Sequence, residues 1–183
     1  MSRKYAIRDQ HHFHFVTFTV VRWIDVFIRN EYKDIFVESV RYCQKEKGLL
    51  VGAWCIMTSH VHMIIASDGT MLLQDIVRDL KSYTSRKIKL AIDGNSKESR
   101  REWMLETMRF LGSFKPNNKG FQMWQHHYHP IELSNNHLID QRLGYVHENP
   151  VVAGFVDNPV DWTYSSARDY EGQSGKIEIC FLE

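Results

Sequence analysis

Residues 49–66 have the sequence LLVGAWCIMTSHVHMIIA, and the fold class can be inferred outward from this stretch. It consists of two short apolar runs, at 49–57 and 61–66, which are separated by the polar segment 58–60. Short runs of this kind, rich in β-branched and aromatic residues and divided by small polar ones, are typical of adjacent strands. A β-hairpin is the simplest connection between them.

The segments on either side of this hairpin carry further strand and helix patterns. Residues 12–21 (HFHFVTFTVV) alternate apolar and polar side chains, which predicts a half-buried strand. Apolar residues at helical spacing predict helices over 31–47, 71–92 and 101–111, and Gly48 is typical of a helix C-terminus. We expect a last helix to begin near 134–136 and to end at Asn149-Pro150, because the residue before proline disfavours helical backbone.

The order of these elements, β-α-β-β-α with a further strand allowed between the later helices, indicates the fold class. It is the order of an α+β protein with a ferredoxin-like split βαβ sheet, antiparallel and with helices packed on one face. A chain of 183 residues with 43% hydrophobic content suits a single domain, so we expect one over residues 1–183. General burial tendencies place Trp23, Trp54, Trp103 and Trp162 in its core.

Composition also limits where the protein functions. No stretch approaches the roughly 20 apolar residues that span a bilayer, and the N-terminal segment lacks the apolar block of a signal peptide. The cysteines, Cys43, Cys55 and Cys180, are widely spaced and contain no C-x-x-C pair, which argues against a disulfide framework or a cysteine zinc site. We therefore expect a cytoplasmic protein without a membrane partner.

Positive charge is concentrated in the middle of the chain, although the net charge is only +1. Residues 71–120 hold 11 Lys and Arg against 6 Asp and Glu, whereas residues 121–183 hold 3 against 9. A phosphate-binding surface should therefore draw on the middle segment, where the candidates are Lys81, Arg86 and Lys87. A solvated basic helix face explains the same pattern equally well.

His60 and His62 are candidate ligands for a divalent metal ion. Residues two apart in a strand project from the same face, so both imidazoles can point at one site while Val61 points away. Neutral imidazole binds divalent metals, and open coordination positions allow such a metal to polarise a phosphate oxygen. The chain has ten histidines, so this pair needs further partners before it indicates a site.

Tyr145 and Asn149 are the candidate partners. They lie four residues apart in an expected helix and so share one of its faces. A tyrosine oxygen can attack a phosphodiester when the charge that develops on the phosphate oxygens is stabilised, and the resulting phosphotyrosine bond retains the energy for rejoining. In the alternative interpretation, Tyr145 only packs, with its hydroxyl hydrogen-bonded.

Several stretches together resemble the single-tyrosine His-hydrophobe-His transposases, which are related to insertion-sequence transposases. They are WCIMTSHVHMII (54–65), Trp124-Gln125, YVHENPVVAGFV (145–156) and YSSARDY (164–170). The resemblance extends from about residue 12 to residue 170. It is greatest to the REP-associated branch, because Asn149 with the following proline stands where other transposases of this class have glutamine.

The resemblance implies a role for each motif residue. Tyr145 would be the nucleophile that cleaves single-stranded DNA, which leaves a 5′-phosphotyrosine link and a free 3′-OH. His60 and His62 would hold Mg²⁺ or Mn²⁺, with Asn149 as the third ligand. The substrate in that branch is an imperfect palindrome that folds into a hairpin beside a short single-stranded recognition sequence. Related transposases often act as homodimers, and the sequence leaves open whether the tyrosine of one chain serves the histidines of another.

The histidine-rich segment 124–129 (WQHHYH) is not expected to be a zinc site. Its histidines fall on different faces of any regular element, and no cysteine lies nearby in the sequence. The resemblance places this segment close to the site, with His129 in contact with DNA.

Other functions fit these residues less well. Nucleotide hydrolases with alternating histidines need a third histidine where Ile64 stands, and phosphoesterases with two His-x-Thr/Ser motifs do not tolerate His62 at its position. A non-catalytic DNA-binding regulator derived from a transposase is the stronger rival. The combination of two histidines, Tyr145 and Asn149 argues against it, because a protein that only binds DNA does not need that set.

Overall fold

The computed structural model describes residues 7, 9–10, 12–114 and 120–182. In chain order its elements are β1 (His14–Thr19), η2 (Val21–Trp23), η3 (Val26–Ile28), α1 (Asn30–Lys47), β2 (Leu49–Ile56), β3 (His60–Ser67), α2 (Leu73–Gly94), α3 (Arg101–Ser113), β4 (Ile131–Glu132), α4 (Asn136–Val152), η5 (Pro159–Asp161) and α5 (Ala167–Tyr170). The predicted hairpin is present as β2 and β3, and each helix expected from the sequence is found within a few residues of its expected bounds.

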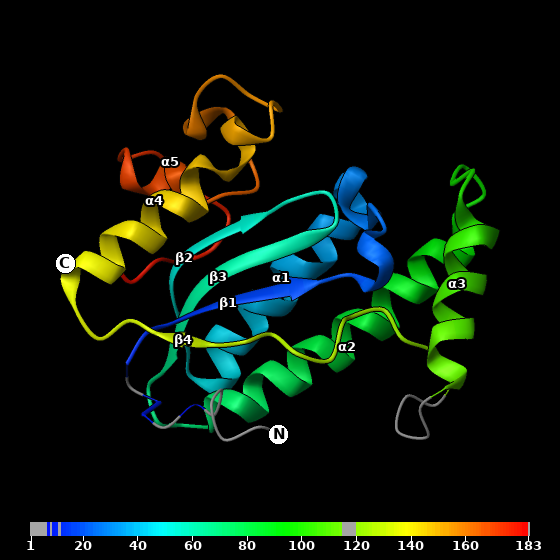
Figure 1. Ribbon diagram of the computed structural model, residues 1–183, viewed down its shortest axis with the longest axis horizontal. Helices are drawn as coiled ribbons and strands as arrows, with labels where there is room; N and C mark the ends of the chain where they lie inside the picture. Colours follow the sequence, from blue (N-terminus) through cyan, green and yellow to red (C-terminus); the bar gives the residue numbers. More distant parts are fainter. Residues whose placement is uncertain (1–6, 8, 11, 115–119, 183) are drawn as a thin grey trace.

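The strands form one antiparallel sheet in the order β2-β3-β1-β4. Strands β2 and β1 both pair with β3 and are therefore parallel to each other, which is the split βαβ arrangement. Figure 1 shows β3 and β1 in the middle of the molecule, with the short β4 at the lower edge of the sheet. The expected α+β class with an antiparallel sheet is confirmed.

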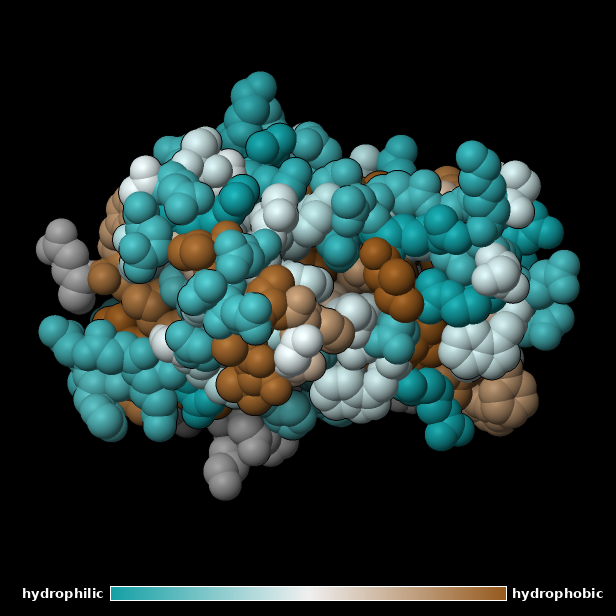
Figure 2. All heavy atoms as spheres, turned by 90° about the horizontal axis from the view of Figure 1, so that it is seen from above, coloured by the Kyte–Doolittle hydropathy of each residue, from teal (hydrophilic) through white to brown (hydrophobic). Residues whose placement is uncertain are grey.

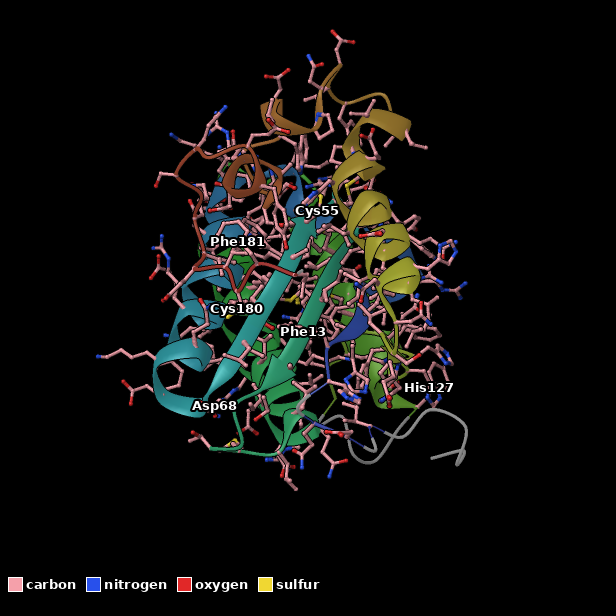
Figure 3. The ribbon with its side chains drawn as sticks, turned by 90° about the vertical axis from the view of Figure 1, so that its left-hand side faces the viewer. Phe13, Cys55, Asp68, His127, Cys180 and Phe181 are labelled. Atoms are coloured by element: carbon pink, nitrogen blue, oxygen red, sulfur yellow. The ribbon has the colours of Figure 1, made fainter. Side chains whose placement is uncertain are left out.

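Helices cover both faces of this sheet, which corrects the expectation that they would cover only one. The main core joins one face to α1, α2 and α3 and includes Phe18, Phe36, Trp54 and Ile76. A second apolar cluster lies on the opposite face, where Phe15, Ile64 and Val146 are buried with parts of β2 and α4. Figure 3 shows α4 along one side of the strands and α1 on the other. Alternation along β1 supplies apolar side chains to both faces, and α4 covers the second of them.

Helix α4 continues through Pro150, so the expected end at Asn149-Pro150 is wrong. The helix ends instead in a turn at Gly154, whose φ is +74°. There the amide of Phe155 donates to the carbonyl of Pro150 and the amide of Gly154 to that of Val151. This pair of bonds satisfies the last carbonyls of the helix. Proline is tolerated in the last turn because the hydrogen bonds that follow it use carbonyl oxygens, including its own, and do not require its missing N–H.

The tryptophans divide between core and surface. Trp54 is fully buried as expected, and Trp162 is partly buried. Trp23 and Trp103 are 59% and 55% exposed, so their expected place in the core is wrong. Trp23 follows β1 in the 3-10 turn η2, where the left-handed backbone turns its side chain outward.

The C-terminal segment covers the outer edge of β2. The amide of Cys180 donates to the carbonyl of Val51, and Figure 3 shows Cys180 and Phe181 beside this strand. A bulge between Val51 and Ala53 brings Gly52 against Leu182, where any β-carbon would approach the leucine within 3 Å. Edge strands that are covered in this way do not expose unpaired backbone groups to other chains.

The described residues contain no helix that could span a membrane. On the side of α4, their surface shows no continuous apolar face. None of the helices described is long and apolar enough to cross a bilayer. Figure 2, which views the molecule from above Figure 1, shows hydrophobic side chains in separate groups among hydrophilic ones. Exposed apolar side chains around the end of α4 include Val152 and Phe155.

A buried carboxylate ties the start of α1 to the connection between α2 and α3. The Glu98 side chain is 1% exposed, and its oxygens accept hydrogen bonds from Arg29 Nε at 2.8 Å and from Arg100 Nε at 3.0 Å. Burial alone would raise the pKa of Glu98, but the hydrogen bonds from the two arginines outweigh it and lower that pKa to about 2. The ionised form is therefore stabilised by the fold.

We expect Glu98→Gln to lower the free energy of unfolding by about 2–3 kcal/mol at pH 7, since the arginines lose a charged partner. Because the pKa is lowered on folding, this stabilisation is complete above the usual pKa near 4.5 and is lost as the pH falls toward 2. Urea denaturation at several pH values measures the difference. Glu102→Gln, at a side chain 84% exposed, is the control, and an equal loss there would contradict the prediction.

Candidate active site

Strand β3 directs His60 and His62 to the same face of the sheet, as the sequence predicts. Their ring centroids lie 4.6 Å apart. His62 is buried with 3% exposure, whereas His60 is partly exposed nearer the end of the strand. Strand β1 lies alongside, with Thr17 opposite His62 and Thr19 opposite His60. The pair thus lies on the face that carries α4, away from the main core.

Hydrogen bonds with hydroxyl groups orient both imidazoles. Thr17 Oγ1 lies 2.9 Å from His62 Nδ1, and Ser59 Oγ lies 3.2 Å from His60 Nδ1. Burial lowers the pKa of His62 to about 3, with smaller effects from the charges of His60 and Arg142. Burial also lowers the pKa of His60. Both rings are therefore neutral near pH 7.

This arrangement suits a divalent metal ion. The Nε2 atom of His62 is buried and has no hydrogen-bond partner among the described residues. The tautomer in which Nδ1–H donates to Thr17 leaves a lone pair on this Nε2, which is the form in which histidine binds metals. Within the described part of the chain, no group of three or more His, Cys, Asp or Glu residues could hold a metal.

Helix α4 is held in place by contacts on the sides that do not face the histidines. Val146 is fully buried in the second apolar cluster, and Pro150 is buried one turn later. His147 Nε2 lies 2.8 Å from Ser166 Oγ, which also contacts the backbone of Trp54 in β2. Burial lowers the pKa of His147 to about 4, so this histidine is a neutral structural link. These contacts fix the rotation of α4.

That rotation places Tyr145 beside the histidines of its own chain. The Tyr145 ring lies 5.1 Å from the His62 ring and 5.8 Å from the Phe15 ring. Tyr145 is 46% exposed, so its side chain is open to solvent. Asn149 is partly buried one turn further along the helix. The structure therefore brings His60, His62 and Tyr145 together within one chain, with Asn149 on the adjoining turn of α4.

A row of aromatic rings continues on both sides of the histidines. The exposed Trp23 ring lies 5.3 Å from His60, in an edge-to-face arrangement. On the other side, Phe15 stacks against His62 at 5.6 Å, and the guanidinium of Arg142 lies 5.1 Å above the Phe15 ring. The site is thus bordered by Trp23 at one end and by Arg142 at the other.

The candidate DNA-binding residues lie in different places. His129 is exposed and lines a hollow of about 520 Å³ beside β1, which extends to Phe15 and Thr17. Lys81 is partly buried, and its ammonium donates to the Gln125 carbonyl at 2.7 Å. Burial lowers the pKa of Lys81 to about 8. Of the four candidates, only His129 lines a hollow that reaches the site.

Arg86 and Lys87 are exposed on α2, in the helix layer that covers the opposite face of the sheet. Arg86 lines a separate hollow between α1 and α2. The structure does not bring these two residues together with the histidines. Contact with DNA at Lys81, Arg86 and Lys87 stays a prediction.

Comparison with known proteins identifies the family of this chain. Residues 8–149 match the model of the family described as IS200-like transposases. The chain belongs to this family. No curated protein is similar enough to the transposase to count as a match.

Solved structures share its fold. The structure of a REP-associated tyrosine transposase bound to a REP hairpin matches with a TM-score of 0.67 and 15% sequence identity, over 100% of this chain and 94% of the other. A protein from Deinococcus radiodurans, described as a candidate transposase, matches over 81% of this chain and 95% of its own, with 19% identity and a TM-score of 0.43. The first similarity supports the fold of the transposase.

Three residues around the site were not singled out for it from the sequence. Thr17 could have been found from the alternation in β1, which places every second residue on one face. Arg142 lies three residues before Tyr145 and so shares its helix face. No sequence signal places Trp23 beside His60, because that contact depends on the left-handed backbone after β1.

Replacing Thr17 should disturb His62 in a specific way. We expect Thr17→Val to lower the free energy of unfolding by about 1–2 kcal/mol, because a buried imidazole nitrogen loses its partner. Thr17→Ser keeps the hydroxyl and should retain most of the stability. Urea denaturation measures the loss, and ¹⁵N chemical shifts of His62 report its tautomer. Unchanged shifts in Thr17→Val would show that the hydroxyl does not set the tautomer.

Proposed function

We propose that this transposase cleaves and rejoins single-stranded DNA through a covalent bond to Tyr145. The observation that carries the proposal is the placement of an exposed tyrosine 5.1 Å from a buried, neutral histidine whose Nε2 has no partner among the described residues. A structural tyrosine would not need a pair of hydroxyl-oriented histidines beside it. The membership of the transposase family supports the same chemistry.

In the cleavage step, the Tyr145 oxygen forms a bond to phosphorus while the bond from phosphorus to the 3′ oxygen breaks. The phenolic proton is lost to solvent, and the departing 3′ oxygen takes up a proton. The products are a 5′-phosphotyrosine link and a free 3′-OH. The reverse step, with a different 3′-OH, joins the strand to a new partner and frees Tyr145. Helix α4, held by Val146 and His147, keeps the tyrosine in place throughout.

His60 and His62 are the residues that would hold Mg²⁺ or Mn²⁺, with the side-chain oxygen of Asn149 as a third ligand. When bound, such a metal supplies a Lewis acid that stabilises negative charge on the phosphate. Thr17 and Ser59 keep the imidazoles oriented for that role, and burial keeps them unprotonated.

The substrate that we propose is single-stranded DNA beside an imperfect hairpin of the REP type. The structural neighbour with a TM-score of 0.67 is bound to a REP hairpin, and Asn149-Pro150 is the feature on which the resemblance to that branch rests. The hollow beside β1, with His129 on its wall, offers room for DNA next to the site. Because Tyr145 and the histidines of one chain lie together, we propose that residues 1–183 act as one domain with a complete site, whether or not the protein forms a homodimer.

The rival function is a DNA-binding regulator without catalysis. It would bind the same hairpins but would need neither a nucleophile nor neutral histidines. The exposed hydroxyl-bearing face of α4 beside His62 favours the enzyme.

We expect the wild-type protein to become covalently attached to a labelled single-stranded oligonucleotide with a hairpin from the DNA that flanks its gene. Tyr145→Phe should abolish attachment, because it removes the attacking oxygen, while binding persists. A denaturing gel detects the adduct, and an electrophoretic mobility shift measures binding. Mg²⁺ or Mn²⁺ should be required, and a chelator should stop the reaction.

Tyr83→Phe is a matched control, because Tyr83 is 45% exposed on α2 compared with 46% for Tyr145. It should react like the wild type. Attachment that persists in Tyr145→Phe would remove this residue as the nucleophile. Tight binding with no attachment to any flanking hairpin would favour the regulator.

A further inference from the structure

Arg142 lies on the face of α4 that faces the histidines. It precedes Tyr145 by three residues, so the two side chains are neighbours on the helix surface. Its guanidinium lies 5.1 Å from the Phe15 ring centroid, and Phe15 in turn stacks on His62. Arg142 therefore packs on the ring that lies directly beside His62.

This guanidinium has no counter-ion in the described part of the chain. Residues 7, 9–10, 12–114 and 120–182 provide no salt bridge to Arg142, and its Nε is buried without a hydrogen-bond partner. Residues 121–183 contain 9 Asp and Glu, so acidic side chains are common in this part of the sequence. A buried arginine donor is costly unless a partner satisfies it.

An anion bound at the site would satisfy that donor. Arginine presents its N–H groups in a planar fork that matches phosphate oxygens, and hydrogen bonds of this kind are strong because both partners are charged. A phosphodiester within reach of the Tyr145 hydroxyl would also lie near Arg142, its neighbour on the same helix face. The packing of the arginine on Phe15 would hold the fork in place before DNA arrives.

We propose that Arg142 binds a non-bridging oxygen of the phosphate that Tyr145 attacks and is thus a further catalytic residue of this site. The inference rests on the proposed function. It assigns the scissile phosphate two flanking partners on one helix face, the nucleophile and a guanidinium. The negative charge that develops during attack would then be stabilised by a group placed in advance.

The test is a thermodynamic cycle in Tyr145→Phe protein, where binding is measured without cleavage. The cleavage position is first mapped from the wild-type adduct, and oligonucleotides are made with either a natural phosphate or a neutral methylphosphonate there. We expect Arg142→Gln to weaken binding of the natural oligonucleotide about tenfold or more. The same substitution should have little effect on the methylphosphonate, because the contacted charge is absent. With Tyr145 intact, Arg142→Gln should slow attachment about 100-fold.

Arg142→Lys and Arg109→Gln complete the design. Lysine keeps the charge without the fork and should retain part of the binding, whereas Arg109, exposed on α3, should be neutral. Equal losses on both oligonucleotides would show that Arg142 only supports the fold and would overturn the inference. If wild-type protein forms the adduct and Arg142→Gln forms it equally fast, this inference alone fails. If wild-type protein neither binds nor attaches, the proposed function fails with it.

A separate observation concerns Trp23. Its φ is +55°, and that of the preceding Arg22 is +56°, a left-handed backbone that is rare and unfavourable for non-glycine residues, especially two in succession. The turn holds a 59% exposed indole with its ring 5.3 Å from His60. Strained backbone that presents an exposed aromatic ring beside a site is a feature that function, rather than stability, explains.

The geometry points to Trp23 as a stacking surface for an unpaired nucleobase next to the scissile phosphate. Base stacking on an aromatic side chain tolerates any base and requires a single strand, so it suits the proposed substrate. This second inference also rests on the proposed function. Trp23 borders the site at the end opposite Arg142, so it would contact a neighbouring nucleotide rather than the attacked phosphate.

In Tyr145→Phe protein, we expect Trp23→Ala to weaken binding of the single-stranded oligonucleotide about fivefold or more, and Trp23→Phe to retain most of the affinity. Trp103→Ala, at a tryptophan 55% exposed on α3, is the matched control and should bind normally. A fluorescent 2-aminopurine moved along the single strand should be quenched at one position by Trp23 but not by alanine. Equal affinity, or quenching that persists in Trp23→Ala, would overturn this inference without touching the role of Tyr145.

Discussion

The pairing of β1 with β3 is the constraint on which the candidate site depends. Its register sets Thr17 opposite His62 and Phe15 opposite Ile64, so that the hydroxyl, the imidazole and the apolar support all lie on one face. A slip of one residue would turn both histidines into the main core. The apolar pattern of the segment 49–66 specifies this register, because Val61 and Met63 of β3 are buried in the main core on the face opposite the histidines.

Helix α4 supplies the second half of the site, and three of its sides make different contacts. Val146 is buried against the sheet, His147 contacts Ser166, and Tyr145 and Arg142 lie beside His62 and Phe15, respectively. The proposed nucleophile is therefore carried by a helix and not by a loop. Such placement limits the motion of Tyr145 relative to His62, which a reaction between positioned groups requires.

Much of this arrangement follows from sequence pattern, because period-2 and helical spacing place residues on faces. The hairpin, the shared face of His60 and His62, and the common side of Tyr145 and Asn149 were all predicted in this way. Contacts between distant elements were not. The covering of the second face by α4, the burial of Lys81 and the outward turn of Trp23 depend on tertiary packing and on two left-handed residues, which no local spacing reveals. The roles of the site residues remain proposals.

The charges around the candidate site are consistent with the proposed DNA substrate. The histidines are neutral because burial disfavours their protonated form, so they can accept a cation, while Arg142 adds a fixed positive charge without a described acidic partner. A bound metal ion would increase this positive charge. None of the described carboxylates is paired with Arg142 to offset it. In the proposed reaction, a phosphodiester would supply the missing negative charge within reach of Tyr145. The overall net charge of +1 is thus a poor guide, because the decisive charges are few, local and buried.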